Sequence, residues 1–109
     1  MARRVAWTLA AVDDLEQAAE YIGRDSPRYS AALVREALRA ARSLSTFSNR
    51  GRIVPELDNQ NIREIFVGRY RLIYHVGAQA VSILGLIHGA RDLGALWDRG
   101  VPGSPQSPE

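Results

Sequence analysis

The chain has 109 residues, of which 46% are hydrophobic and 24% are charged, and its formal net charge is +2. These values are typical of one soluble globular domain with a modest core. No apolar run approaches the roughly 20 residues that a membrane span needs, and no apolar signal segment follows the basic N-terminus. The absence of cysteine excludes a disulfide scaffold and a thiolate metal site. We therefore expect a cytoplasmic protein without a membrane partner.

The 14 basic residues are all arginine. The planar arginine fork suits carboxylates and phosphates, so the composition is compatible with an acidic protein partner or with nucleic acid. Codon bias of the genome is the alternative reason for the missing lysine. No run of five or more like charges occurs, which excludes a basic tail of the kind that binds DNA.

The N-terminal third predicts a short strand followed by a helix. Residues 3–7 are the candidate strand, Thr8 is a plausible N-cap, and Gly23 is a reasonable end of the helix. One apolar stripe recurs at offsets of four, three and four residues, and it consists of Ala11, Leu15, Ala18 and Ile22. Acidic residues gather towards the helix N-terminus, where the helix dipole favours them.

A second helix is predicted to start at Ser26 as the N-cap and Pro27 as the first helical residue. Its apolar stripe consists of Val34, Ala37, Leu38, Ala41 and Leu44. The opposite face carries Arg28, Arg35, Arg39 and Arg42. Two helices with so short a connection should form an antiparallel hairpin. The arginine face is either an ordinary solvated surface or a phosphate-binding surface.

After an irregular loop at residues 45–61, three candidate strands occupy residues 63–67, 70–76 and 81–87. Gly68 and Gly77 stand at the two reversals, where each can adopt the positive φ of a short turn. Connections this short predict an antiparallel meander.

Alternation of side chains assigns two faces to the middle strand. One face carries Tyr70, Leu72, Tyr74 and Val76, and the other carries Arg71, Ile73 and His75. The last strand is apolar on both sides, so it should be the most buried of the three.

The order of elements predicts an α+β fold, in which an N-terminal strand and an αα-hairpin pack on an antiparallel sheet with a C-terminal three-stranded meander. The pattern does not decide whether the first strand is central or at an edge. Residues 1–99 should form the single domain, with a short turn at 95–99 that docks Trp97. Residues 100–109, rich in proline, glycine and serine, should be a disordered tail.

Several short motifs, in this order and spacing, resemble the toxins of type II toxin–antitoxin modules in the RelE/ParE superfamily, and most closely its ParE branch. The similarity covers about residues 4–93. The motifs that carry it are Gly51-Arg52, Pro55-Glu56-Leu57, Ile62-Arg63-Glu64, Gly68-Arg69-Tyr70-Arg71 with Ile73-Tyr74, and His88-Gly89-Ala90-Arg91-Asp92. The resemblance implies an αα-hairpin on an antiparallel sheet, which agrees with the prediction from the residue pattern.

The same resemblance implies a bacterial toxin that a cognate antitoxin neutralises, the antitoxin folding an acidic or amphipathic segment on it. ParE-like members act on DNA gyrase, whereas RelE-like members cut mRNA in the ribosome. Toxins of the ParE branch commonly pair within toxin–antitoxin assemblies, so a toxin dimer is a further possible partner.

The residues leave three interpretations to weigh: a gyrase inhibitor, a metal-independent ribonuclease, and an inactive or antitoxin-sequestered scaffold. A nuclease needs a proton-transfer group close to cations, and its candidates are Arg63, Arg71, His88 and Arg91, with Glu64 or Tyr74 as further proton-transfer groups. By resemblance, Arg71 and Arg91 match functional arginines of RelE nucleases. RelE proteins carry a cluster of basic residues on the preceding strand, and here that cluster is reduced because Glu64 stands beside Arg63. Trp97 lies near the position of a RelE tyrosine, and tryptophan cannot transfer a proton. These departures favour a non-enzymatic gyrase inhibitor.

The residues that we expect to bind the target or the antitoxin are Arg52, Arg63, Arg69, Tyr70, Arg71, Tyr74, His88 and Arg91. Structural roles are the alternative for several of them. His88 would hydrogen-bond a turn, Arg91 would pair with Asp92, and the tyrosines would lie at the edge of the core. With two histidines, no cysteine and no ligand spacing, the sequence predicts no metal and no cofactor.

Overall fold

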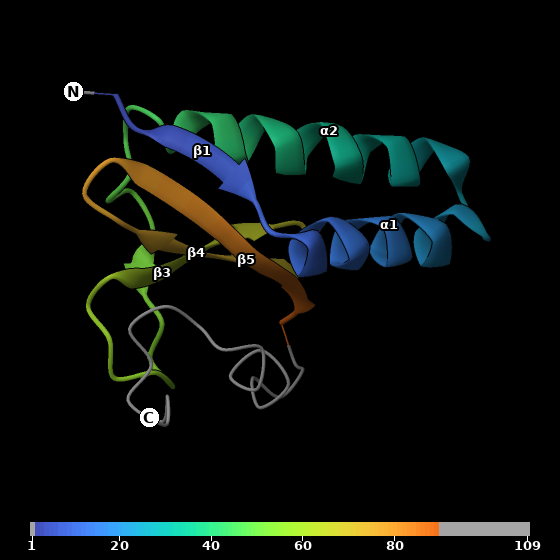
Figure 1. Ribbon diagram of the computed structural model, residues 1–109. Coiled ribbons are helices and arrows are strands. Elements are labelled where there is room, and N and C mark those ends of the chain that lie inside the picture. The colour runs from blue at the N-terminus through green and yellow to red at the C-terminus, as the bar shows by residue number, and fades with distance from the viewer. Residues whose placement is uncertain (1, 90–109) are drawn as a thin grey trace.

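The computed structural model describes residues 2–89, and in this range the chain forms two helices and one five-stranded sheet. The helices are α1 (Leu9–Gly23) and α2 (Pro27–Ser43). The strands are β1 (Arg4–Trp7), β2 (Arg52–Ile53), β3 (Ile62–Val67), β4 (Tyr70–Val76) and β5 (Ala80–His88). Both helices lie side by side over one face of the sheet (Figure 1). The predicted α+β fold is confirmed.

The helix starts follow the predicted capping residues. The Thr8 hydroxyl accepts a hydrogen bond from the Ala11 backbone N–H at 3.1 Å. The Ser26 hydroxyl accepts one from the Tyr29 N–H at 3.2 Å, with Pro27 in the first turn. Each cap satisfies a backbone donor that has no partner inside the helix. The two boundaries are therefore set by local sequence.

The strand order is β1-β5-β4-β3-β2, and β3, β4 and β5 form the predicted antiparallel meander. The N-terminal strand β1 lies at the edge and pairs with β5 in parallel, so the sheet is mixed rather than wholly antiparallel. At the opposite edge, β2 forms within the segment that is irregular by sequence.

Two details differ from the sequence-based expectations. Leu38 is 39% exposed, whereas Leu33 is 7% exposed and takes its place in the buried stripe, because the face of α2 that meets the sheet is centred on Ala37. Among the described residues only Gly68, at 60°, has a positive φ, so the expectation for Gly77 was wrong. A Cβ at Gly77 would instead lie 3.0 Å from the Ala80 carbonyl oxygen, so glycine serves close approach there.

The core consists of one large and one small apolar cluster on opposite faces of the sheet. The large cluster joins both helices to alternate residues of the strands, including Leu72 and Tyr74 of β4. The small cluster packs Val54 and Leu57 of the loop before β3 against Ile73 and Leu84. The predicted two faces of β4 are thus confirmed, and β5 contributes to both clusters. No helix in residues 2–89 is long and apolar enough to cross a membrane.

Strand β5 extends past the end of β1, and helix α1 supplies the contact that β1 does not. The register pairs Trp7 with Ile83, where β1 ends. The pairing of β5 with β4 shifts register between Ile83 and Gly85. Just after this shift, the Leu86 backbone N–H donates to the Asp14 carboxylate at 3.0 Å. A side chain from the helix thereby satisfies a strand donor that would otherwise lie open at the sheet edge.

Replacing Ala37 by leucine should destabilise the fold by about 1–3 kcal/mol, because Ala37 is fully buried between α2 and the sheet and the added atoms force the helix outward. Ala31→Leu, on the exposed side of the same helix, is the matched control. Urea unfolding followed by circular dichroism should show a lower midpoint only for Ala37→Leu. Equal midpoints for the two variants would contradict the described packing.

Candidate functional site

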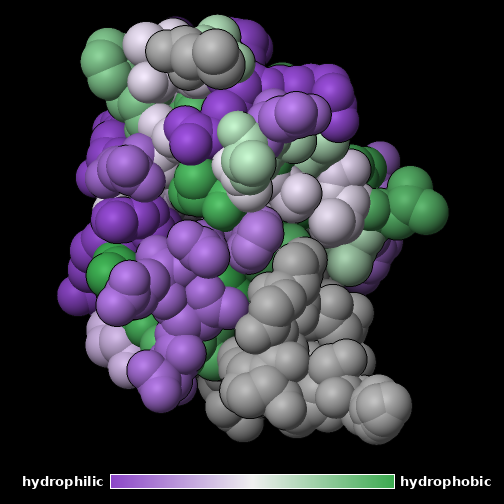
Figure 2. Space-filling view, turned by 60° about the vertical axis from the view of Figure 1, so that its left-hand side comes forward, coloured by the Kyte–Doolittle hydropathy of each residue, from purple (hydrophilic) through white to green (hydrophobic). Residues whose placement is uncertain are grey.

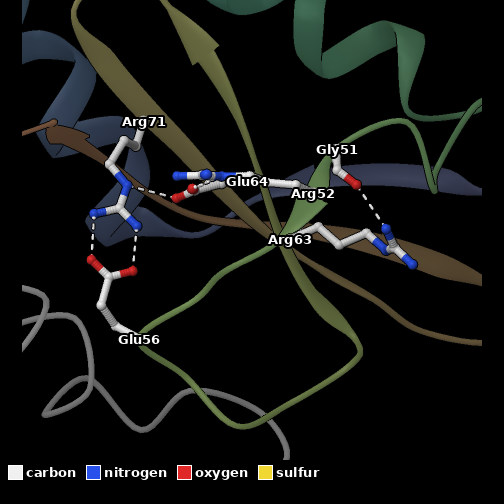
Figure 3. Close-up of polar contacts among 6 residues, drawn as sticks. All are labelled: Gly51, Arg52, Glu56, Arg63, Glu64 and Arg71. Carbon is white, nitrogen blue, oxygen red and sulfur yellow. Dashed lines mark hydrogen bonds and ion pairs between the residues drawn. The ribbon is translucent and has the colours of Figure 1, made fainter.

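The sheet face away from the helices carries an ionic network, built around the buried carboxylate of Glu64 on β3 (Figure 3). One Glu64 oxygen accepts from Arg71 Nε of β4 at 2.6 Å, and the other accepts from Arg52 Nε of β2 at 2.6 Å. The Glu64 side chain is 0% exposed and that of Arg71 is 4% exposed. The carboxylate therefore joins three strands from inside the protein.

Glu56 in the loop before β3 completes the network. Its two oxygens accept from Arg71 Nη1 at 3.0 Å and Nη2 at 2.8 Å, a bidentate pair in which the planar guanidinium matches the carboxylate. The hydrogen bonds from Arg71 hold the pKa of Glu56 below its usual 4.5. The hydrogen bonds from Glu56, and then those from Glu64, raise the pKa of Arg71 despite its burial. Arg71 is therefore a permanently charged residue with both of its carboxylate partners in place.

A second polar group lies around Gly51, at the start of β2. The Tyr74 hydroxyl accepts from the Gly51 backbone N–H at 2.9 Å, and Arg63 Nη1 donates to the Gly51 carbonyl at 2.7 Å. A Cβ at Gly51 would lie 2.5 Å from the Glu64 carbonyl oxygen, so a side chain does not fit. Burial raises the pKa of Tyr74, and its phenol stays protonated as a core residue.

Three further predicted residues meet at the other end of β4. Tyr70 and His88 are register partners, and their rings meet edge to face with centroids 5.5 Å apart. Arg69 lies in the preceding turn, where its carbonyl accepts from the Gly89 N–H at 2.9 Å. Tyr70 and Tyr74 are four residues apart, or about 13 Å along a strand. The predicted site residues therefore form two groups rather than one.

Accessibility separates these residues further. Arg52, Arg69 and His88 are exposed, and Arg63 and Tyr70 are partly exposed. Arg71 and Tyr74 are buried, with their polar atoms bound to other parts of the chain. Arg91, Asp92 and Trp97 lie outside the described residues. The exposed members are the ones whose side chains are available to another molecule.

The sequence reasoning did not identify Glu56 and Glu64 as the partners of Arg71. The available signal was the alternation in β3, which places Glu64 between Ile62 and Phe66 on the face that also carries Arg71 across the ladder. An acid among large apolar residues on one strand face indicates a buried partner of opposite charge. Within residues 2–89, no three His, Asp or Glu side chains gather as a metal site would require.

Replacing Glu64 by leucine should destabilise the protein by about 3–5 kcal/mol, because it leaves the buried Arg71 guanidinium without one of its two carboxylates. The double variant Glu64→Leu/Arg71→Met removes both charges and should recover most of this loss. Guanidinium unfolding of Glu64→Leu, Arg71→Met and the double variant gives the coupling free energy between the two side chains. A double variant that loses the sum of the single losses would show that the pair is not coupled.

The pH dependence of Glu56 provides a second test. Because Arg71 lowers the folded-state pKa of Glu56, its contribution is present above pH 4.5 and is lost as pH falls through the lowered pKa. Glu56 is half exposed, so the effect should be about 1 kcal/mol or less. Carboxyl NMR titration should give a midpoint below 4.5 that rises in Arg71→Met. An unchanged midpoint in that variant would exclude Arg71 as the cause.

Comparison with known proteins gives consistent matches. The model of a family described as the ParE toxin of the type II toxin–antitoxin system parDE matches residues 5–93. Toxin RelE2 of Caulobacter vibrioides is 33% identical over 89 residues, which are 81% of this chain and 97% of that protein.

Two solved structures share the fold. A chain of the chromosomal ParDE system from P. aeruginosa aligns with a TM-score of 0.65 at 18% identity, covering 79% of this chain and 95% of that one. A chain of the RelBE2 toxin–antitoxin complex from Mycobacterium tuberculosis aligns with a TM-score of 0.54 at 26% identity, covering 81% and 99%. Since the family match extends from β1 to beyond β5, the chain belongs to the ParE family of type II toxin–antitoxin toxins, within the RelE/ParE superfamily.

Proposed function

We propose that this toxin acts by binding DNA gyrase and blocking it, in the cytoplasm, and that a cognate antitoxin encoded beside it neutralises it. The observation that carries the proposal is the engagement of Arg71 by two carboxylates. A guanidinium held in this way stabilises the protein, and little of it is left to stabilise charge on a reacting phosphate. The match to the ParE family model is the second support.

The arrangement of the other nuclease candidates favours binding over catalysis. A ribonuclease without metal must deprotonate a 2′-hydroxyl and stabilise the phosphate with nearby cations. His88 ends β5 and lies opposite Tyr70, the first residue of β4. Arg63 of β3 lies opposite Tyr74, towards the other end of β4, and is bound to the Gly51 carbonyl. The Tyr74 hydroxyl is buried on the Gly51 N–H. The described residues therefore do not gather the groups that such a reaction needs.

The interaction surface that we propose consists of the accessible predicted residues. It comprises Arg52, Arg63, Arg69, Tyr70, His88 and, in the part of the sequence that follows, Arg91. Arg71 and Tyr74 support this surface from inside. Arg52 is 60% exposed, and its guanidinium also lies 5.8 Å from the Phe66 ring centroid, so one cation and one exposed aromatic face the same partner. An acidic antitoxin segment would meet matching charge there.

The alternative is a ribosome-dependent mRNA endonuclease of the RelE kind. It is favoured by the exposed His88 beside Tyr70, with Arg69 in the adjacent turn and Arg91 three residues later in the sequence. The relative named RelE2 is a further reason to test it.

The full chain, purified free of its antitoxin, should inhibit supercoiling of relaxed plasmid by gyrase and leave ribosome-bound mRNA intact. Both assays use the same preparation, and added antitoxin should restore supercoiling. Cleaved mRNA together with unaffected supercoiling would replace the proposal by the endonuclease alternative. If supercoiling is unaffected and the mRNA stays intact, both gyrase and the ribosome are excluded as targets.

The variant His88→Ala separates binding from catalysis. Loss of a catalytic proton-transfer group should lower the cleavage rate by about 10²–10⁴-fold. Loss of one interface side chain should weaken gyrase inhibition by about tenfold or less. Arg24→Ala, exposed at the end of α1, is the matched control and should change neither activity. A thousandfold loss of the measured activity in His88→Ala, with the fold retained, would contradict a role of His88 in binding alone.

A further inference from the structure

The outer face of α2 carries a row of arginines that the proposed function does not use. The helix buries Leu33, Ala37 and Ala41 against the core. With 3.6 residues per turn, the opposite face presents four exposed guanidinium side chains, which we call the α2 arginine row: Arg28, Arg35, Arg39 and Arg42. The row extends about 21 Å, at 1.5 Å per residue.

The charges of this row are not neutralised within the protein. None of the four side chains forms a hydrogen bond or an ion pair with another residue in the range 2–89. Arg35 and Arg39 are four residues apart, and Arg39 and Arg42 are three apart, so like charges stand next to each other on the helix surface. Such pairs destabilise a helix. A solvated face gains nothing from this arrangement, whereas a bound polyanion would relieve the repulsion.

Positive charge continues beyond the C-terminal end of the row. Arg50 Nη1 donates to the Ser43 hydroxyl of the last helical turn at 2.8 Å, and Arg63 binds the adjacent Gly51 carbonyl. In the view of Figure 2, hydrophilic residues cover much of the described surface, and several hydrophobic areas lie among them.

The neighbouring helix has the opposite charge. Asp13, Glu16 and Glu20 are exposed on α1, while α2 has a single acid, Glu36. The two helices lie side by side, so the hairpin presents an acidic strip next to a basic one. A polyanion would be attracted to α2 and repelled from α1, which fixes the side on which it binds.

The chemistry of the row suits nucleic acid better than a protein segment. A folding peptide segment needs apolar side chains or open backbone groups to bind. On α2 the backbone is used by the helix, and the exposed apolar residues Tyr29 and Leu38 lie to either side of the row by helical periodicity. A surface that offers only guanidinium groups binds through the anionic groups of its partner, and a nucleic acid backbone presents these as a regular row of phosphates.

The row also distinguishes among nucleic acids. Its only exposed aromatic neighbour on α2 is Tyr29, beside the first arginine, so successive unpaired bases would find no series of rings to stack on, which disfavours single strands. Its contacts are with phosphates, which duplex DNA and duplex RNA share, and competition by duplex RNA in the test below separates the two. We infer that the α2 arginine row binds the phosphate backbone of double-stranded DNA without reading its sequence. This binding does not depend on which macromolecule the toxin inhibits.

The test is fluorescence anisotropy of a labelled duplex of about 20 base pairs, titrated with the antitoxin-free full chain between 50 and 200 mM salt. Each neutralised phosphate contributes about −0.9 to the slope of log K against log salt concentration, so four arginines predict a slope of about −3 to −4. The variant Arg35→Gln/Arg39→Gln should reduce the slope to about −2 and weaken binding at least tenfold at 50 mM salt.

The matched control is Arg4→Glu, which changes the net charge by the same two units. Arg4 alternates with the core-facing Val5 on β1, so it points to the sheet face that the helices do not cover. Its affinity and salt slope should equal those of the unmodified chain. Equal losses in the control and the double variant would reduce the effect to net charge and overturn the proposal.

Competition by poly-glutamate, a single-stranded oligonucleotide and duplex RNA decides between sources of negative charge. Poly-glutamate and a single-stranded oligonucleotide should compete for the labelled duplex more weakly than unlabelled duplex DNA. Stronger competition by poly-glutamate would replace DNA by an acidic protein as the partner, and preference for duplex RNA would replace it by RNA.

Because the double variant removes like-charge pairs, its thermal midpoint should equal or exceed that of the unmodified chain, and a lower midpoint would contradict the argument from repulsion.

Discussion

The contact between Arg71 and Glu64 is the interaction on which the open face of the sheet depends. Two opposite charges are almost fully withdrawn from water at 2.6 Å, which is tolerable only because every remaining polar atom is paired. Glu56 and Arg52 complete the pairing from the solvent side. One buried carboxylate and one buried guanidinium thereby fasten β2, β3, β4 and the preceding loop to each other. Beside them lies the small apolar cluster, in which Val54 and Ile73 are fully buried.

This network also explains why the toxin's arginines divide into two kinds. Arg71 is used inside the chain, where it holds the loop that carries Glu56 in place. Arg52 and Arg63 are each bound to the chain, to Glu64 and to the Gly51 carbonyl, but they remain open to solvent, and Arg69 is exposed as well. A surface that must bind another macromolecule needs both kinds, because cations on a rigid support lose less freedom on binding. The proposed target surface follows from this division.

Local signals in the sequence predicted most of the fold. The caps at Thr8 and Ser26 and the turn at Gly68 depend on residues within four positions, so a single sequence contains the information. The parallel pairing of β1 with β5 joins residues about 76 positions apart, as in Arg4 and Ala80, and no short pattern encodes it. The exchange of Leu33 for Leu38 in the buried stripe likewise depends on the direction in which α2 meets the sheet.

The site was less predictable than the fold for the same reason. The resemblance to RelE nucleases identified Arg71 as important, but its role depends on Glu56, which approaches from 15 positions earlier through a loop of irregular sequence. Tyr74 was recognised through its motif, yet only the ladder between β3 and β4 brings it under Gly51. A motif therefore locates chemically active residues, whereas the three-dimensional contacts decide which of them face solvent.

The hydrogen bond from Leu86 to Asp14 has a consequence for how the free toxin behaves at high concentration. The second half of β5 has no strand neighbour among the described residues on the side where β1 ends. Another copy that tried to extend the sheet there would have to displace a carboxylate and bury its charge against the newly added backbone. The acid on α1 thus opposes the fibril-like stacking of copies along this part of the sheet edge.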